Sequence, residues 1–409
     1  MRLAFVDLFF SWPPRGGGEV DVCHVARLLR EAGHDVHLFV PRIERSGDRG
    51  CISEELPFPF TSIPFARRDF TRDRVAARVR EAVDAYRPEG VFVCNGAYLK
   101  PYVLRALARY PLAVRLYAYE AVCIRDMMRF LNGAPCPLNY LETPNKCRRC
   151  ALRFHGPQIR QWRFQSTTHE FVAGRAYMPE YHRVLREALA GCRTALVSND
   201  LMRDQIAGLV PSVHVVPGGV TVSEFAYPPN AESSKTNKKI VLMCGRAEDP
   251  MKGLGLLREA GELLGQDRDD FEIWATHPDL SQSHGRYRAV GWRTPGQMRE
   301  LYQQADICVI PSLWEEPFGL VALEAMASGK PVCAACVGGV QHIVRHGQTG
   351  FLFERGNAAA LAQCLELLLD SPALCAEMGA AGRRIAAEEY DWGRVVAQYY
   401  PPILEELRA

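Results

Sequence analysis

The stretch that decides the fold is Leu3-Ala-Phe-Val-Asp-Leu-Phe9, followed by Pro13-Pro-Arg-Gly-Gly-Gly18, a helical pattern over 19–32 and Val36-His-Leu-Phe-Val40. The first and last runs are short and apolar, as is typical of buried strands. The glycines between them predict a tight loop that leads into the helix. Strand, loop, helix and strand make a βαβ unit, which predicts a parallel sheet with helices on its faces.

The same alternation continues along the chain. Apolar runs at 90–94, 113–117 and 194–198 predict further strands, and a boundary falls near Val215–Val220, followed by the polar stretch 228–239. A second series of strands is predicted at 240–244, 271–275, 307–310 and 331–335. We therefore predict an α/β protein of GT-B type: two Rossmann-like doubly wound domains facing a central cleft. The predicted domains are 1–215 and 216–389, with a C-terminal helix at 390–409 that packs back on the first domain.

Composition narrows the possible classes of protein. A chain of 409 residues is too long for one ordinary core, and its net charge of +2 argues against bulk nucleic-acid binding. No apolar run reaches the ~18 residues of a membrane span, and the N-terminus lacks the pattern of a secretory signal. We therefore expect a cytoplasmic protein in which most of the 14 cysteines are reduced.

Two basic and two acidic residues of the C-terminal half suggest a nucleotide-sugar site. Arg246 follows Gly245 after a predicted strand, and Lys252 lies at the start of the next helix. The flat arginine fork and the lysine charge suit a diphosphate. Glu316 and Glu324 stand eight positions apart around a helix start, where carboxylates can accept hydrogen bonds from sugar hydroxyls. Plain surface cations and acids of a solvated helix start are the alternative interpretations.

As an ordered set, the motifs resemble the family 4 glycosyltransferases, which are retaining enzymes of the GT-B architecture. The matches are spread over nearly the whole chain. They are Gly16-Gly-Gly-Glu19, Gly33-His34, Val216-Pro-Gly-Gly-Val220, Gly245-Arg246, Lys252-Gly253, Ala305-Asp306, Pro311-Ser312, Glu316 with Glu324, Ala325–Pro331, Gly338-Gly339 and Gly347–Phe351.

The resemblance implies transfer of a sugar from a nucleoside diphosphate, UDP or GDP above all, to a hydroxyl acceptor. That acceptor would be a glycan, a lipid-linked sugar or a natural product, and catalysis would need no metal or other cofactor. The resemblance assigns the diphosphate to Arg246 and Lys252, the donor sugar to Glu316 and the ribose to Glu324. The second domain would bind the donor and the first domain the acceptor. A nucleotide-sugar epimerase and a catalytically silent nucleotide-sugar binding protein are the alternatives.

Other residues are expected to contact substrate. The backbone at Gly16 and Gly17 would approach the diphosphate or the acceptor, unless this loop is a plain tight turn; the chain has no dinucleotide fingerprint there. Phe318 and Gly319 form the turn after Glu316. Trp292 lies in a segment expected near the nucleobase of the donor. His342 replaces the usual family glutamate, and would either contact the donor or simply begin a helix.

The acceptor side departs from the family. Many members carry a histidine after the strand at 113–117, where this chain has Tyr119 and Glu120. We expect Glu120 to make a polar contact near the acceptor and count it with the catalytic residues; a structural role is the alternative. Retaining transfer without a protein nucleophile does not require a strong base here, since the leaving phosphate oxygen can take the acceptor proton.

A cysteine-bearing insert is predicted at 120–165. Four thiolates, with one Cys-x-x-Cys pair, could hold a structural zinc ion, while a disulfide and unligated thiols are the alternatives. The cysteines are Cys123, Cys136, Cys147 and Cys150. The basic and aromatic stretch 148–163 would face an anionic or lipid-linked acceptor, with peripheral contact to the inner face of the membrane, or else is a solvated face.

Overall fold

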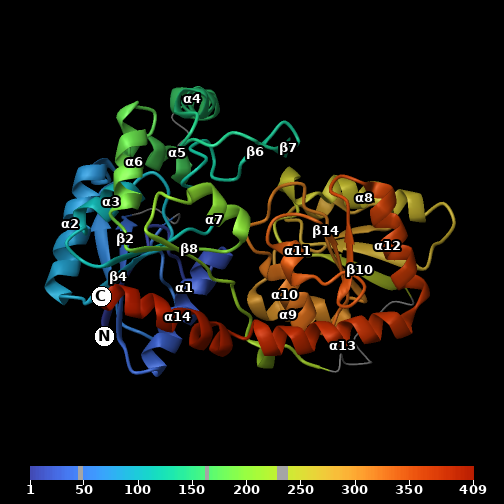
Figure 1. The fold of residues 1–409 in the computed structure, drawn as a ribbon. Helices are drawn as coiled ribbons and strands as arrows, with labels where there is room; N and C mark the ends of the chain where they lie inside the picture. The colour runs from blue at the N-terminus through green and yellow to red at the C-terminus, as the bar shows by residue number, and fades with distance from the viewer. Residues whose placement is uncertain (45–48, 162–164, 228–237) are drawn as a thin grey trace. The chain divides into compact units, whose positions relative to one another are not determined.

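The computed structural model describes residues 1–44, 49–161, 165–227 and 238–409, so most of the polar stretch 228–239 lies outside it. The chain divides into two compact units. Unit 1 comprises residues 1–129, 137–217 and 395–409, and unit 2 comprises residues 130–136 and 218–394. Each unit has its own parallel β-sheet with helices packed on it (Figure 1).

Unit 1 is built on a seven-stranded sheet of order β3-β2-β1-β4-β5-β8-β9. All neighbouring strands are parallel, and the central ones are buried on both faces, which explains their unbroken apolar runs. The strands are β1 (Arg2–Val6), β2 (Asp35–Ile43), β3 (Phe60–Phe65), β4 (Gly90–Val93), β5 (Leu112–Arg115), β8 (Thr194–Val197) and β9 (Ser212–Val215).

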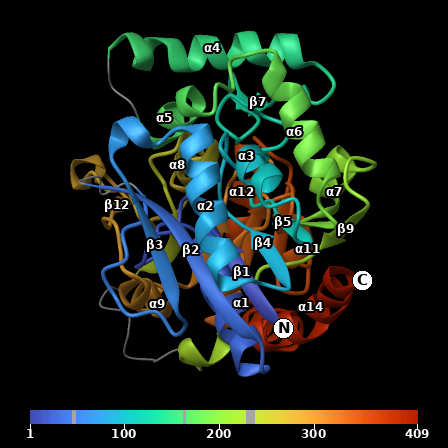
Figure 2. The same cartoon turned by 90° about the vertical axis from the view of Figure 1, so that its left-hand side faces the viewer.

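Helices connect these strands, and Figure 2 shows α2 lying across the strands at one side of the sheet. The helices are α1 (Gly17–Glu31), α2 (Arg72–Tyr86), α3 (Lys100–Ala106), α4 (Pro144–Arg160), α5 (Ser166–Ala173), α6 (Glu180–Ala190) and α7 (Asp200–Ile206), with the short η1 (Arg67–Asp69).

The C-terminal helix α14 (Trp392–Arg408) ends in unit 1. The Tyr400 ring lies 6.2 Å from the Phe92 ring of β4. Leu407 packs so closely on Gly90 that a Cβ there would come within 3.2 Å of its side chain. Arg193 donates a hydrogen bond to the Glu406 carbonyl at 3.0 Å. The last fifteen residues are therefore part of the core packing of unit 1.

Unit 2 has a six-stranded parallel sheet of order β12-β11-β10-β13-β14-β15. Apolar clusters cover both of its faces, and α8 packs beside α12 while α10 packs beside α13. The strands are β10 (Lys239–Met243), β11 (Phe271–Ala275), β12 (Tyr287–Ala289), β13 (Ile307–Ile310), β14 (Val332–Ala335) and β15 (Gly350–Phe353).

The remaining elements of unit 2 are its helices and a small hairpin. The helices are η2 (Val222–Glu224), η3 (Pro250–Lys252), α8 (Leu254–Leu264), η4 (Leu280–Gln282), α9 (Pro295–Gln304), α10 (Leu320–Ala327), α11 (Val340–Ile343), α12 (Ala358–Asp370) and α13 (Pro372–Glu389), and the hairpin pairs β6 (Phe130–Leu131) with β7 (Ala134–Pro135). In the described residues no single helix is long and apolar enough to cross a membrane, although the bent pair α12 and α13 passes that test jointly.

One feature of the unit 2 sheet positions the site. Strand order reverses between β10 and β13, so the loops that leave the carboxyl ends of these two strands lie side by side. Gly253, with φ +82°, is the point of closest approach, because a Cβ there would come within 1.8 Å of the Pro311 carbonyl oxygen. Only glycine therefore fits at this crossing.

Candidate functional site

An ion pair joins the two loops at this reversal point. Lys252 ends the turn after β10, and its Nζ lies 2.7 Å from Oε1 of Glu316, which follows β13. The Ser312 hydroxyl donates to the same Oε1 at 2.6 Å. The Lys252 ammonium also lies 5.1 Å from the centre of the Trp314 ring. Lys252 is thus held in one place by a carboxylate and an aromatic face.

Glu316 is ionised at neutral pH. Its burial, with only 7% of the residue exposed, favours the neutral acid. The charge of Lys252 and the hydrogen bonds from Lys252 and Ser312 outweigh this, so the pKa of Glu316 is lower than usual. The side chain can therefore accept hydrogen bonds but has no proton to give.

The turn that carries Glu316 rests on the glycine pair after β14. The Gly339 amide donates to the Glu316 carbonyl at 2.7 Å. A Cβ on Gly338 would come within 2.1 Å of that carbonyl oxygen, and one on Gly339 within 2.6 Å of the Pro317 oxygen. Glu315 contributes to the same support, since it accepts from the Gly338 amide at 2.8 Å. The glycine pair thus lets the turn that carries Glu316 pack directly against the backbone after β14.

Glu324 lies in the second turn of α10, whose N-cap is Gly319 with φ +111°. The Tyr302 hydroxyl donates to Oε2 of Glu324 at 2.7 Å. Burial raises the pKa of Glu324, although this hydrogen bond opposes the change. In the sequence, Tyr302 is one more apolar position of α9, so the pattern gave no sign of its contact with Glu324. The Tyr302 hydroxyl occupies one oxygen of Glu324, and within the described residues no other side-chain hydrogen bond reaches this carboxylate.

Arg246 shares a loop with Lys252 but is held differently. Its side chain is 46% exposed and its Nε lies 3.1 Å from Oδ2 of Asp249. Gly245, with φ +103°, makes the bend just before it. Arg246 is therefore a surface cation on the same loop as Lys252, and it must leave Asp249 to bind an anion with its full fork.

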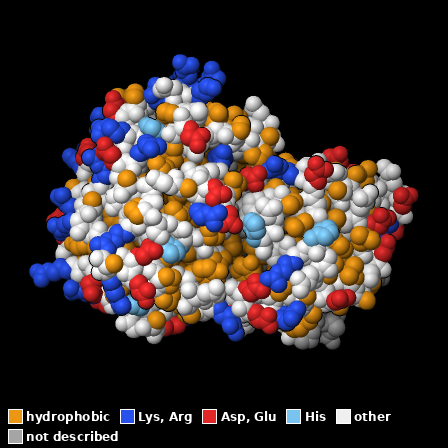
Figure 3. Space-filling view, viewed as in Figure 1, with side chains coloured by type: hydrophobic (Ala, Val, Ile, Leu, Met, Phe, Trp, Pro, Cys, Tyr) orange, Lys and Arg blue, Asp and Glu red, His pale blue; other side chains and the backbone are white. Residues whose placement is uncertain are grey.

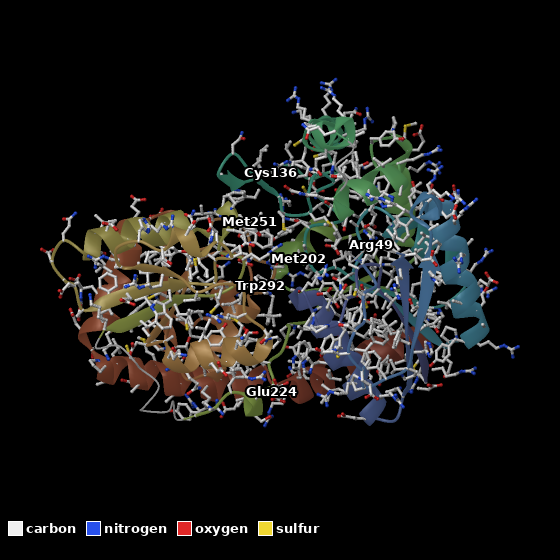
Figure 4. The ribbon with its side chains drawn as sticks, turned by 180° about the vertical axis from the view of Figure 1, so that it is seen from behind. Arg49, Cys136, Met202, Glu224, Met251 and Trp292 are labelled. Atoms are coloured by element: carbon white, nitrogen blue, oxygen red, sulfur yellow. The ribbon has the colours of Figure 1, made fainter. Side chains whose placement is uncertain are left out.

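Trp292 and His342 lie at the margin of this group. Trp292 is 56% exposed in the loop after β12, and Figure 4 shows it at the same end of unit 2 as Met251 of the Lys252 turn. His342 is exposed on α11, and its carbonyl accepts from the Tyr390 hydroxyl at 3.5 Å. Within the described residues, no hydrogen bond or ion pair connects either side chain to Lys252 or Glu316.

The glycine loop of unit 1 already binds a carboxyl group of its own chain. Gly16 caps α1, and Gly17 is the first residue of that helix. Oε2 of Glu19 accepts from the amides of Arg15 and Gly16 at 2.6 and 2.7 Å. Burial raises the pKa of Glu19 to about 7. An approaching phosphate would therefore compete with the Glu19 carboxylate for these amides, which the glycine pattern alone did not indicate.

The contacts of Glu120 bear on the two roles considered for it, acceptor contact and structural support. It is buried, and its Oε1 accepts from Lys100 at 3.0 Å and from the Tyr117 amide at 3.2 Å. Its Oε2 accepts from the Ala118 amide at 2.9 Å. Tyr119 is buried as well, with 2% of its surface exposed. Both carboxylate oxygens thus hold the loop after β5 in place, and this favours the structural alternative for Glu120.

The four cysteines of the insert do not form a ligand set. Among the described residues, which include all four, no group of three or more His, Cys, Asp or Glu side chains could hold a metal ion. Cys147 contacts the Thr143 hydroxyl at 3.6 Å, and Cys123 contacts Asp126 at 3.7 Å. The fourth cysteine, Cys136, falls in the unit 2 hairpin segment. This arrangement does not favour zinc binding by Cys123, Cys136, Cys147 and Cys150, which stays an untested prediction.

Solved structures first define the class. The chain is similar over its whole length to sucrose-phosphate synthase from Thermosynechococcus elongatus, with a TM-score of 0.69, 19% identity and coverage of 100% of this chain and 99% of that one. HepE of Anabaena, solved with UDP-glucose, gives a TM-score of 0.67 at 16% identity over 99% and 100% of the two chains. The chain therefore has the GT-B fold of glycosyltransferases, as predicted.

Sequence comparison then gives the family. Residues 284–385 match the family model described as Glycosyl transferases group 1. The phosphatidyl-myo-inositol mannosyltransferase of Mycobacterium leprae is 30% identical over 49% of this chain and 56% of its own length. The D-inositol 3-phosphate glycosyltransferase of Corynebacterium diphtheriae is 33% identical over 54% and 58%. The chain, which spans about half the length of these relatives, is related to the family 4 glycosyltransferases, and the predicted resemblance is confirmed.

Proposed function

We propose that this protein transfers a sugar from a nucleoside diphosphate to a hydroxyl acceptor, with retention of anomeric configuration. The observation that carries the proposal is the Lys252–Glu316 pair at the reversal point of the unit 2 sheet. Ligands of doubly wound sheets bind at this edge. A cation for phosphate oxygens and a carboxylate for sugar hydroxyls, 2.7 Å apart, suit a sugar diphosphate.

Each charged group has a distinct part in this proposal. Lys252, held by Glu316 and Trp314, is a preorganised charge that stabilises the leaving diphosphate more as its negative charge grows. Arg246 adds a second cation when it turns from Asp249 to the phosphate. Glu324, oriented by Tyr302, accepts hydrogen bonds from the ribose hydroxyls. Lys252 and Arg246 together supply the charge that a divalent metal would otherwise provide, so the reaction we propose needs none.

The proposed reaction needs no base from the protein. The bond from the sugar C1 to the phosphate oxygen breaks, and the acceptor oxygen bonds to C1 on the same face. The acceptor proton passes to the leaving phosphate oxygen. This route fits the position of Glu120, whose carboxylate is already bound to Lys100 and two backbone amides.

Two solved relatives support a nucleotide donor. HepE of Anabaena was solved with UDP-glucose, and the catalytic domain of starch synthase IV from Arabidopsis thaliana with ADP and acarbose. The inositol phosphate and phosphatidylinositol named for the curated relatives support a hydroxyl acceptor. Among nucleotides we favour UDP or GDP.

The test combines donor screening with product analysis. A thermal-shift screen against UDP-, GDP-, ADP- and TDP-sugars should reveal the donor, because a bound ligand raises apparent stability. Incubation with that donor and candidate acceptors should then give a product of unchanged anomeric configuration. The variants Arg246→Ala and Lys252→Ala should lose turnover by about 100-fold or more. Lys239→Ala, at the opposite end of β10, should keep it.

Other results would overturn the proposal. An inverted product would contradict retention, and near wild-type turnover in both variants would contradict the phosphate assignment. An epimerised donor formed without acceptor would indicate the epimerase alternative. Tight donor binding without transfer or slow hydrolysis would indicate the silent binding protein.

A further inference from the structure

Helix α4 of unit 1 concentrates positive charge. Residues 144–160 contain five lysines and arginines and no aspartate or glutamate, in a chain whose net charge is only +2. The proposed donor site does not use this helix. The helix includes most of the basic stretch 148–163, of which Trp162 and Arg163 lie outside the described residues.

Four of the five cations share one face of the helix. At about 100° per residue, their positions fall within an arc of about 60° and along a length of about 21 Å. They are Lys146, Arg149, Arg153 and Arg160, all of them exposed. We call this set the basic face. In the described part of the chain no acidic side chain forms an ion pair with it, and none of the four has a further partner.

The opposite face of α4 attaches the helix to unit 1. Ala151 and His155 are its buried residues. The His155 ring stacks on Phe171 at 4.1 Å, and its Nδ1 lies 2.9 Å from the Thr168 hydroxyl. The helix is therefore anchored on α5, so the basic face points outward as a fixed surface.

The pictures agree with this orientation. Figure 2 shows α4 running along one edge of unit 1 with nothing drawn beyond it. In Figure 3, lysine and arginine side chains gather at the top of the view, where Figure 1 places α4. Leu152, which is 43% exposed, adds an apolar side chain beside the cations.

We propose that the basic face of α4 docks unit 1 on an anionic lipid surface. A straight row of cations on a helix that lies in the membrane plane matches a flat layer of lipid phosphates, and Leu152 can enter the interface between them. A nucleic acid is the weaker fit, because the exposed apolar side chain gains nothing there and the chain as a whole is nearly neutral.

Vesicle sedimentation tests the proposal with the full chain. Wild-type protein should bind phosphatidylcholine vesicles that contain phosphatidylglycerol, should ignore vesicles of phosphatidylcholine alone, and should dissociate as salt is added. Because each cation near such a surface contributes about fivefold in binding, the variant Arg149→Glu with Arg153→Glu should lose at least tenfold. Lys146→Gln with Arg160→Gln gives a second, milder variant of the same face.

The control reverses the same amount of charge elsewhere on unit 1. Arg68→Glu with Arg80→Glu changes two exposed arginines of η1 and α2 and should leave vesicle binding unchanged. Circular dichroism verifies that every variant is folded. Failure of wild-type protein to bind anionic vesicles would overturn the proposal, as would equal loss in test and control variants. Binding to a DNA duplex in place of vesicles would also overturn it. Vesicle binding is measured without turnover, so it is independent of the proposed activity.

Discussion

Replacing Lys252 by methionine should leave Glu316 as a buried carboxylate with no cation beside it. In the wild type, the charge and hydrogen bond of Lys252 help to hold the pKa of Glu316 below its usual value against the effect of burial. Without Lys252 the effect of burial remains, and the hydrogen bond from the Ser312 hydroxyl at 2.6 Å opposes only part of it. We therefore expect the pKa of Glu316 to rise above its usual value in Lys252→Met.

The loss of folding stability in Lys252→Met can be gauged from the burial of the Lys252–Glu316 pair. Removing one partner of a buried ion pair costs about 3–5 kcal/mol, and the lower end applies because 20% of the Lys252 side chain is exposed. We therefore expect Lys252→Met to lose about 3 kcal/mol of stability at neutral pH. The exposed pair Lys239–Asp306 is the matched control, and Lys239→Met should cost less than about 1 kcal/mol.

The effect of Lys252→Met on stability should depend on pH, in a direction set by the pKa of Glu316. The lowered pKa of wild-type Glu316 adds stability above the unfolded value of about 4.3, and this is lost as pH falls through the folded value. In Lys252→Met the raised pKa has the opposite effect, because stability falls as pH rises through it. The deficit of the variant should therefore be largest at neutral pH and should shrink in acid.

Urea unfolding followed by tryptophan fluorescence at neutral pH and at about pH 4.5 measures this deficit. The double variant Lys252→Met with Glu316→Gln should be more stable at neutral pH than Lys252→Met alone, since it leaves no buried charge. A deficit that is the same at both pH values, together with a double variant no more stable than the single one, would refute the reasoning.

Three further predictions concern the surroundings of the pair. Tyr302→Phe should weaken donor binding about fivefold in calorimetry, because Glu324 loses one hydrogen bond of about 1 kcal/mol; unchanged affinity would separate Tyr302 from the site. Gly253→Ala should lower the free energy of unfolding by at least about 2 kcal/mol, since its Cβ would collide with Pro311. Gly255→Ala, with open space around it, should raise the free energy of unfolding by about 0.5–1 kcal/mol. Equal effects of the two substitutions in urea unfolding would contradict this prediction. If the four cysteines of the insert bind zinc, elemental analysis of the purified protein should find stoichiometric zinc. A protein without zinc would contradict the predicted zinc site.

The fold could be predicted because its central strands are buried on both faces. Strand β11 has the bounds that its apolar run indicated, and β13 does as well. The strands that escaped prediction include β3, β12 and β15, each for a physical reason. β3 contains Pro64 and lies at the sheet edge, β12 has only three residues, and β15 starts with glycine. Each gains its place from a neighbouring strand and carries little pattern of its own.

The candidate site was predictable as a set of residues but not as a set of contacts. Spacing pointed to Lys252 and Glu316 separately, while their direct pairing depends on the reversal of strand order, which sequence does not display. For Glu120, the sequence position was informative but the contacts were hidden. Its position after a strand suggested acceptor contact, yet its partner Lys100 is twenty residues earlier in the chain. Glu19 was hidden in the same way, because its side chain folds back on the amides of its own loop.

The central claim is that the cations after β10 bind the diphosphate of a nucleotide donor. Calorimetric titration of UDP, GDP, ADP and TDP into wild-type protein, Arg246→Ala, Lys252→Ala and the control Lys239→Ala tests it most directly. We expect at least one of these diphosphates to bind wild type and control equally and to bind each of the other two variants at least about tenfold more weakly. Equal affinity in all four proteins, or no binding of any diphosphate to the wild type, would contradict it.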